Sequence, residues 1–295
     1  MYIGEIAAIL AAVCWSINSI LFSEAGKKIG SQSVNHLRLW GALILLVIIQ
    51  LTIFQKLLPD LSSSGFLYLA ISGIIGFFIG DALLFESYVL IGPRMGMLMM
   101  TAVPIFSVFL GWLFLKEKLN VWQLTAIGIT TISIAFVIED KKNNSSSKIK
   151  HLFKGTLFGL GGALGQAIGL LFSKKGMLEG TNPVSANLIR IMAATITMSL
   201  FLLIKQKFFK DFGKLKQKGI APRIIGGAIF GPIIGVVLSL VAILHTQIGI
   251  ASTLMAISPV ILIPLSRIIY KEHITFKTIL WTCVAIAGAS WLFFL

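Results

Sequence analysis

Long apolar stretches separated by short polar segments are the dominant pattern along the chain. A helix needs about 20 apolar residues to cross the hydrocarbon core of a bilayer. Ten stretches come close to this length, at 4–23, 37–54, 66–90, 95–115, 121–138, 155–173, 185–204, 222–244, 247–270 and 275–295. Only Gly92–Arg94 separates the third stretch from the fourth, and the eighth and ninth lie closer still. We therefore expect ten membrane-spanning helices, with a tight helical hairpin in each of these pairs.

Composition supports a bilayer location. Hydrophobic residues make up 57% of the 295 residues and charged residues only 12%, whereas soluble domains carry about 25% charged residues. The first stretch lacks a basic leading region and a small-residue cleavage site, so we interpret it as a span and not as a signal peptide. Cys14 and Cys283 both fall inside predicted spans, which argues against a disulfide framework.

The net charge of +14 raises the question of a nucleic-acid partner. The basic residues lie in the connecting loops, and no soluble segment offers the basic and aromatic surface that nucleic-acid readers use. Contact with anionic lipid headgroups accounts for these charges more simply. We expect the lipid bilayer as a partner and no nucleic acid.

The sequence repeats itself. "MMTAVPIFSVFLGWLFLKEKL" (Met99–Leu119) aligns with "LMAISPVILIPLSRIIYKEHI" (Leu254–Ile274) at an offset of 155, and "NHLR" (Asn35–Arg38) aligns with "NLIR" (Asn187–Arg190) at an offset of 152. Blocks in the same order with nearly constant spacing indicate an internal duplication. The predicted units are a first repeat at 1–140, a polar linker at 141–154 and a second repeat at 155–295.

Each predicted repeat holds five helices, and five is odd. The second copy therefore enters the membrane the opposite way up. Inverted repeats around a shared midplane are a recurrent architecture of secondary transporters, in which alternating access exposes one site to each side in turn. The predicted fold is an all-α integral membrane protein with ten transmembrane helices arranged as two inverted five-helix repeats.

The repeated segments "PIFSVFLGWLFLKEKL" and "PVILIPLSRIIYKEHI" resemble the proline-to-glutamate signature of the drug/metabolite transporter superfamily, and specifically of its ten-helix EamA-type transporters. The second copy departs slightly, with His273 where the first has Lys118. The resemblance implies a transporter of small molecules in the cell membrane. Members export amino acids and other metabolites, import choline, or exchange nucleotide sugars and phosphosugars. We expect a functional monomer without a cofactor or a metal ion.

Asp81 is the most informative candidate site residue. It lies near the middle of an apolar stretch, where a charge costs about 2.5–3.5 kcal/mol on insertion scales and therefore favours the bundle interior. Helical spacing places Phe85 and Tyr88 on the same face, so a carboxylate beside aromatic rings is predicted to bind an amine or carry a proton. A structural Asp that bonds to a neighbouring helix is the alternative. Glu86, about 140° around the helix, is a second proton-coupling candidate, with an interfacial position or an ion pair as its alternative.

Further polar residues fall in or near the predicted spans. The resemblance implies that the first helix of each repeat lines the central cavity, which makes Trp15, Asn18 and Gln166 candidate substrate contacts, with interhelical hydrogen bonding as their alternative role. His245 ends the eighth stretch and is a candidate for binding or proton relay, although a capped surface residue fits its position too.

Arginine and glutamate recur at matched helix ends. The matched Arg38 and Arg190 are expected at headgroups or loops, with a clamp for an anionic substrate as their alternative. Glu117 and Glu272 also match, and each is expected to form an ion pair that closes the bundle, as a gate or a scaffold.

Proline and glycine suggest where helices bend and meet. Pro104 and Pro259 are each expected to kink a span by removing a backbone hydrogen bond, which makes them hinge candidates. Small residues recur at every fourth position, a spacing that allows close contact between helices in a membrane. These series are Ser72, Gly76 and Gly80; Gly161, Gly165 and Gly169; and Gly227, Gly231 and Gly235.

Loop charges and the resemblance imply opposite orientations. The loops after odd-numbered helices hold 18 Lys and Arg residues, the other side holds six, and Arg267 lies inside a span. The positive-inside rule then places both termini outside, whereas the family resemblance implies cytoplasmic termini. A reporter fused after Leu295 that fluoresces only in the cytoplasm distinguishes the two.

The leading functional hypothesis is a secondary active transporter of a small polar or amphipathic metabolite, amino-acid-like or amine-bearing, with proton coupling through Asp81. A broad-specificity exporter of cationic drugs is the alternative within transport. The sequence has no Asp-rich pair for a prenyl pyrophosphate, no HExxH zinc helix and no Walker loop, which disfavours an intramembrane enzyme. A structural membrane protein would have no need of inverted repeats.

Overall fold

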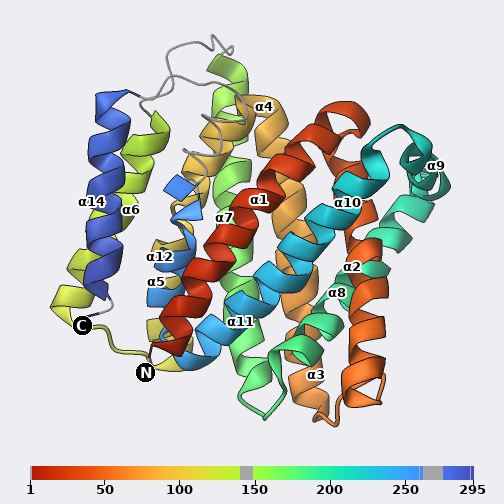
Figure 1. The fold of residues 1–295 in the computed structure, drawn as a ribbon, viewed down its shortest axis with the longest axis horizontal. Helices are drawn as coiled ribbons and strands as arrows, with labels where there is room; N and C mark the ends of the chain where they lie inside the picture. Colours follow the sequence, from red (N-terminus) through yellow and green to blue (C-terminus); the bar gives the residue numbers. More distant parts are fainter. Residues whose placement is uncertain (1, 140–148, 259, 262–274, 293) are drawn as a thin grey trace.

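A computed structural model describes residues 2–139, 149–258, 260–261, 275–292 and 294–295. Within these residues the chain is helical and contains no strand. The first part comprises α1 (Ile3–Ile29), α2 (Ser31–Phe54), α3 (Ser63–Gly73), η1 (Ile74–Gly80), α4 (Asp81–Met100), α5 (Val103–Leu115) and α6 (Val121–Glu139). The second part comprises α7 (Ile149–Met177), α8 (Pro183–Ile204), α9 (Phe208–Gly213), η2 (Lys214–Lys216), α10 (Ile220–Ala228), η3 (Ile229–Gly235), α11 (Val236–His245), α12 (Ile248–Met255) and α14 (Phe276–Leu292). Figure 1 shows how these helices are arranged.

The apolar helices agree with the predicted spans in most places. Among the described residues, six helical segments are long and apolar enough to cross a membrane, and three shorter apolar helices accompany them, in α5, α6 and α14. The predicted ninth span, 247–270, is described only as α12 and a few residues after it. The all-helical membrane architecture is therefore confirmed, and the count of ten spans stays a prediction.

The predicted boundary between the third and fourth spans was wrong. Helix α4 continues through Gly92–Arg94 to Met100, and the first break is the turn at Thr101–Ala102. Pro104 follows as the second residue of α5, where the missing N–H has no intrahelical partner to lose. Pro104 therefore starts a helix and does not kink one. Pro259 lies outside the described residues, but the turn at Ala256–Ile257 interrupts the second copy 155 positions later.

Helices α1 and α7 run in opposite directions. Near the start of α1, Gly4 packs so closely against Thr246 that an added Cβ would lie 3.0 Å from the Thr246 side chain. Near the end of α7, the Lys174 Nζ donates to the carbonyl oxygen of the same Thr246 at 2.7 Å. The start of α1 and the end of α7 therefore lie at one end of the bundle, which is also the end that holds both termini (Figure 1).

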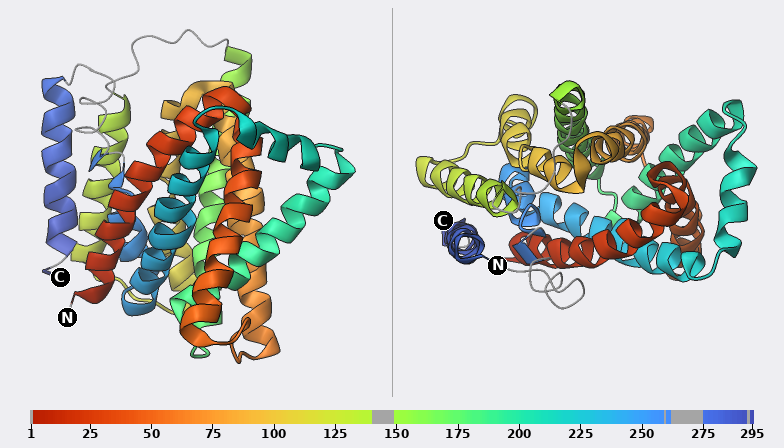
Figure 2. Two further views of the ribbon diagram at one scale, coloured as in Figure 1. Left: turned by 45° about the vertical axis from the view of Figure 1, so that its right-hand side comes forward. Right: turned by 90° about the horizontal axis from the view of Figure 1, so that it is seen from above.

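The two parts of the chain exchange their first helices. Helix α1 packs along α10, η3 and α11, whereas α7 packs along α3, η1 and α4. Figure 2 shows α1 beside α10 and α7 beside α4 from two further directions. Each first helix thus contacts the third helical segment of the other part of the chain.

Close glycine contacts hold α7 against η1. A Cβ added to Gly165 would lie 3.0 Å from the Gly80 Cα, and one added to Gly169 would lie 3.3 Å from the Gly76 Cα. The small-residue spacing predicted such an approach, since lipid supplies little hydrophobic drive between helices and close packing must replace it.

Both π-helices, η1 and η3, occupy matching places in the repeat. They span seven residues each and lie 155 positions apart. Pro232 lies inside η3, but η1 has Phe77 at the matching position, so proline is not the shared cause. A π-turn disrupts the regular backbone bonding of a helix. The Asn35 Nδ2 donates to the Phe77 carbonyl at 3.3 Å and the Asn187 Nδ2 donates to the Pro232 carbonyl at 2.6 Å. The repeated Asn therefore stabilises each π-helix from the neighbouring span.

Candidate functional site

Asp81 forms a buried ion pair with Arg38. Asp81 is 6% exposed and follows directly after η1, and its Oδ2 accepts a hydrogen bond from the Arg38 Nη2. Its Oδ1 accepts a second bond from the Gln166 Nε2 at 2.8 Å. The Arg38 Nε donates to the Asn35 Oδ1 at 2.8 Å. Three spans, α2, α4 and α7, thus meet at one carboxylate.

Arg190 is the second buried arginine. It is 2% exposed and is the eighth residue of α8, about 10 Å along the axis from the start of that helix. Its Nε donates to the Ser72 Oγ at 2.8 Å, and its guanidinium lies over the Phe77 ring at 4.6 Å from the centroid. The Ser72 Oγ in turn donates to the Gly169 carbonyl at 2.6 Å. Arg190 thereby links α8 to α3 and η1.

The two arginine networks meet at Gly76. The Gln166 Nε2 donates to the Gly76 carbonyl at 3.3 Å, and a Cβ added to Gly76 would lie 3.7 Å from the Arg190 Nη2. We call this group the central cluster; its members are Arg38, Ser72, Asp81, Gln166, Ser173 and Arg190. Two arginines and one aspartate give it a formal charge of +1.

The arginine positions correct a prediction. Arg38 and Arg190 were expected at headgroups or loops, but both are buried inside the bundle. The duplicated Asn-x-x-Arg was the available signal, because two polar residues at the same spacing in both repeats fit an inward face better than a helix end. Asp81 lies inside the bundle as predicted, and its closest partners are a guanidinium and an amide.

The other predicted contacts surround this cluster unevenly. Phe85 lies beside Arg38, with the guanidinium carbon 5.5 Å from its ring centroid. The side chain of Tyr88 lies outside the part of the chain that the structure describes. Trp15 and Asn18 pack against η3, where a Cβ on Gly235 would lie 2.7 Å from the Trp15 ring and one on Gly231 would lie 2.8 Å from the Asn18 amide. Gln166 is the member of this set that bonds directly to Asp81.

Glu86 and His245 are not part of the central cluster. Glu86 is exposed on α4. His245 is exposed at the end of α11, and its Nδ1 lies 2.9 Å from the Val241 carbonyl oxygen. His245 does line a cavity of about 560 Å³ at the end of the bundle that holds the termini.

An ion pair lies beside this terminal cavity. The Lys174 Nζ donates to the Glu117 Oε1 at 2.6 Å, and the Glu117 Oε2 accepts the backbone N–H of Ile248 at 2.9 Å. Glu117 was predicted to form an ion pair that closes the bundle, and these contacts, which join α7, the segment after α5 and the start of α12, fit an ion pair at this place. Glu272, its repeat counterpart, lies outside the described residues.

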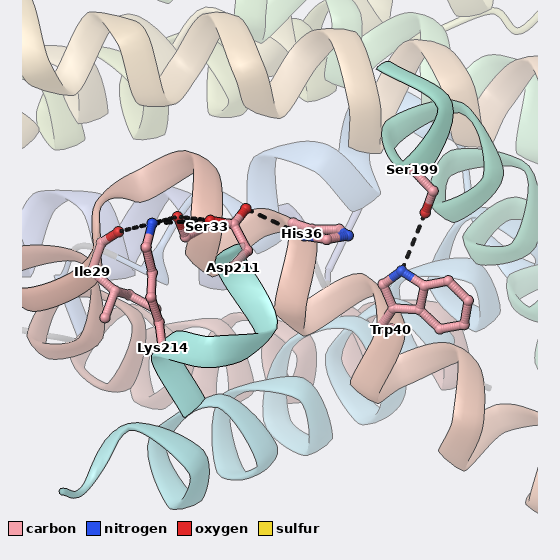
Figure 3. Close-up of polar contacts among 7 residues, drawn as sticks. All are labelled: Ile29, Ser33, His36, Trp40, Ser199, Asp211 and Lys214. Carbon is pink, nitrogen blue, oxygen red and sulfur yellow. Dashed lines mark hydrogen bonds and ion pairs between the residues drawn. The ribbon is translucent and has the colours of Figure 1, made fainter. Parts of the chain in front are cut away.

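A second polar cluster lies at the opposite end, under the short helix α9. Figure 3 shows Asp211 between Ser33, His36 and Lys214. The Asp211 Oδ1 accepts from the Ser33 Oγ at 2.7 Å and from the Lys214 Nζ at 2.9 Å, and its Oδ2 lies 3.3 Å from the His36 Nδ1. This segment lies in the predicted loop between the spans at 185–204 and 222–244. These contacts fasten α9 to the start of α2.

Within the described ranges, no three His, Cys, Asp or Glu side chains come together in a way that fits a metal ion. The central cluster instead offers hydrogen-bond donors and acceptors and an excess positive charge, which suit recognition of a polar solute.

Known proteins resemble this chain both in sequence and in fold. The sequence model of the EamA-like transporter family matches residues 2–139 and again residues 153–294. One solved crystal structure aligns over 98% of this chain and 96% of its own, with a TM-score of 0.77 and 12% sequence identity, a likeness that shows the fold alone. No curated protein matches the sequence.

Proposed function

Since the chain belongs to the EamA-like transporter family, we propose that it is a secondary active transporter that moves a small polar or amphipathic metabolite across the cell membrane by alternating access. The family is one of multi-pass membrane transporters within the drug/metabolite transporter superfamily. The substrate, the coupling ion and the alternating mechanism are the proposed part.

The central cluster is the observation that carries this proposal. A buried ion pair and a second buried arginine inside apolar spans are expensive in a membrane protein and mark transport pathways by default. The cluster lies where spans from both parts of the chain meet, since Gln166 and Ser173 come from α7 while Asp81 and Ser72 come from α4 and α3. A substrate bound here would contact both moving parts.

An inverted pair of five-helix repeats is the proposed frame for this movement. Three observations support it: the opposite directions of α1 and α7, the matching π-helices, and the exchange of first helices between the parts. Two inverted halves have two nearly equivalent packings, each open to one side of the membrane.

The charge of the cluster bears on the substrate. Asp81 bonds to Arg38, so the region is cationic overall and does not offer a free carboxylate to a cationic drug. This favours a metabolite transporter over the cationic drug exporter. Asp81 stays the proposed site of proton coupling, because a proton on its carboxylate would weaken the pairing with Arg38 and Gln166 and so link protonation to the contacts among α2, α4 and α7.

Proteoliposomes test this function. Purified protein should exchange a labelled metabolite from a defined panel, and should accumulate it when a pH gradient is imposed. Asp81→Asn should retain exchange and lose pH-driven accumulation. Glu86→Gln, at the second coupling candidate, should retain both, because Glu86 is exposed and lies outside the central cluster. Wild-type behaviour of Asp81→Asn in both assays would refute its coupling role. Absence of exchange for every panel compound would count against the transporter itself.

A further inference from the structure

Arg190 carries a buried charge that has no counter-ion among the residues the structure describes. Its guanidinium forms no ion pair within the described residues, and its Nη1 is buried without a hydrogen-bond partner. Its contacts are a neutral hydroxyl, Ser72, and an aromatic ring, Phe77. A buried charge without a partner is costly, so its retention calls for an explanation.

The two repeats differ in whether the arginine has an acidic partner. Arg38, the counterpart of Arg190 in the first part of the chain, pairs with Asp81. The position that matches Asp81 in the second part, 155 residues on, is Val236. Arg38 therefore has a carboxylate partner within its own repeat, whereas Arg190 contacts Ser72 and Phe77 of the other repeat and meets no carboxylate among the described residues.

A buried acceptor without a partner stands on the same helix. The Asn187 Oδ1 is buried and unbonded, and it lies three residues before Arg190, on the same face of α8. Its orientation is fixed, because the Nδ2 donates to the Pro232 carbonyl at 2.6 Å. Across η3, the Asn18 Oδ1 is also buried and unbonded. One charged donor and two neutral acceptors around the two π-helices are thus buried without a hydrogen-bond partner among the described residues.

We propose that Arg190 binds the carboxylate of the transported molecule, and that Asn187 Oδ1 accepts an N–H or O–H bond from a donor beside that carboxylate. This inference rests on the proposed transport function, because Arg190 is 2% exposed and meets solute only when the two parts of the chain move apart. The planar guanidinium matches a carboxylate with two parallel hydrogen bonds. The ligand then supplies the negative charge that the described residues around Arg190 do not.

Pairs of compounds that differ only in this charge provide the first test. Thermal unfolding of the detergent-purified protein is followed with a panel of small amino acids and hydroxy acids, each beside its own carboxamide. At least one acid should raise the unfolding temperature, and its amide should not. Arg190→Gln should abolish the shift, and Arg190→Lys should retain part of it. If no acid of the panel stabilises the protein, or if acid and amide act alike, the proposal is wrong.

Ser72 offers a matched pair that keeps the test decisive if the arginine variants do not fold. The Ser72 Oγ lies 2.8 Å from the Arg190 Nε, so Ser72→Asp places an internal carboxylate beside the guanidinium. Ser72→Asn has the same size and no charge. Relative to Ser72→Asn, Ser72→Asp should weaken binding of the stabilising acid by about tenfold or more, because the internal ion pair competes with the ligand. Equal affinities for the two variants would overturn the proposal.

Exchange in proteoliposomes separates this inference from the transport function. Exchange of a neutral or cationic compound that survives Arg190→Gln unchanged would leave the transporter in place and refute the carboxylate site. Acid binding that depends on Arg190, in a protein that exchanges no panel compound, would support the site and count against transport.

Discussion

At the scale of single residues, Arg38 and Asp81 depend on each other because both are buried. Removing one partner of a buried pair leaves an uncompensated charge and costs about 3–5 kcal/mol. We expect Arg38→Gln to destabilise the protein by about this amount, and adding Asp81→Asn to recover part of the loss. Unfolding titrations with SDS in mixed micelles measure both variants and the double variant. Strictly additive effects would contradict direct coupling.

Glu179 is expected to make stability depend on pH at the end of the bundle that holds the termini. It accepts hydrogen bonds from the Ser62 and Ser64 hydroxyls, and these bonds lower the pKa of its carboxyl from 4.5. A lowered pKa in the folded state gives stability that is complete above the unfolded value and is lost as pH falls through the folded value. The difference in unfolding temperature between wild type and Glu179→Gln should therefore be constant above about pH 5 and shrink in more acidic buffer. If the difference in unfolding temperature instead grows as the pH falls, the pKa of Glu179 is not lowered in the folded state and the prediction is wrong.

The sequence predicted the location of Asp81 better than its partners. A carboxylate within an apolar span must face inward, and it does. Whether its neighbour is Phe85, Arg38 or Gln166 depends on which spans meet, and no local pattern encodes that. The same limit explains why Arg38 and Arg190 were expected at helix ends, since each begins an apolar run and only tertiary packing places it beneath other helices.

At the scale of elements, the close contact between α7 and η1 depends on glycines, which carry no side chain. Gly165→Ala would put its Cβ 3.0 Å from the backbone of Gly80, and overpacking of this kind costs about 1–3 kcal/mol. Gly128 on α6 is the matched control, because a Cβ there meets nothing within 4 Å. Gly128→Ala should be neutral or stabilise by about 0.5–1 kcal/mol. Unfolding temperatures of the two variants check the contrast, and equal losses would contradict it.

The elements that hydropathy misses are those set by other forces. Spans follow directly from the need to bury apolar residues in lipid, so α8 begins and ends within two residues of its predicted range, and α1 and α2 contain theirs. The π-helices η1 and η3 depend on hydrogen bonds from asparagine side chains of neighbouring spans, and α9 depends on the hydrogen bonds of the buried Asp211. The break at Thr101 shows the same limit, because the glycine and proline at Gly92–Arg94 suggested a turn where the helix continues.

At the scale of the whole molecule, the two repeats share backbone features but differ in the side chains that pack around them. The π-helices and their asparagines recur, but where glycines of η1 meet glycines of α7, glycines of α10 and η3 meet Phe22, Asn18 and Trp15 of α1. The contact between η1 and α7 is made by glycines on both sides, whereas large side chains of α1 fill the corresponding contact in the second repeat. The ion pair at Asp81 likewise has no acidic counterpart at Val236. The duplication was readable from the sequence, whereas this asymmetry in packing needed coordinates.

The pair of Glu117 and Lys174 is expected to hold the terminal end of the bundle closed. Alternating access requires this end to open in one state, and the pair joins α7 to the segment after α5 and to the start of α12. Glu117→Gln removes the charge and should favour the open state, where each 1.4 kcal/mol corresponds to about tenfold in population. Ile250 is 5% exposed and lines the adjacent cavity, so a cysteine there reports opening.

The measurement uses Ile250→Cys in a background with Cys14→Ser and Cys283→Ser, labelled with a maleimide in detergent, where both ends of the bundle are accessible. Glu117→Gln should raise the labelling rate several-fold, since reactivity follows the open population when opening is fast. Glu5→Gln is the matched control, because Glu5 lines the same cavity and takes no part in the pair with Lys174. An unchanged rate in Glu117→Gln, or an equal rise in Glu5→Gln, would show that the pair stabilises the fold without gating it.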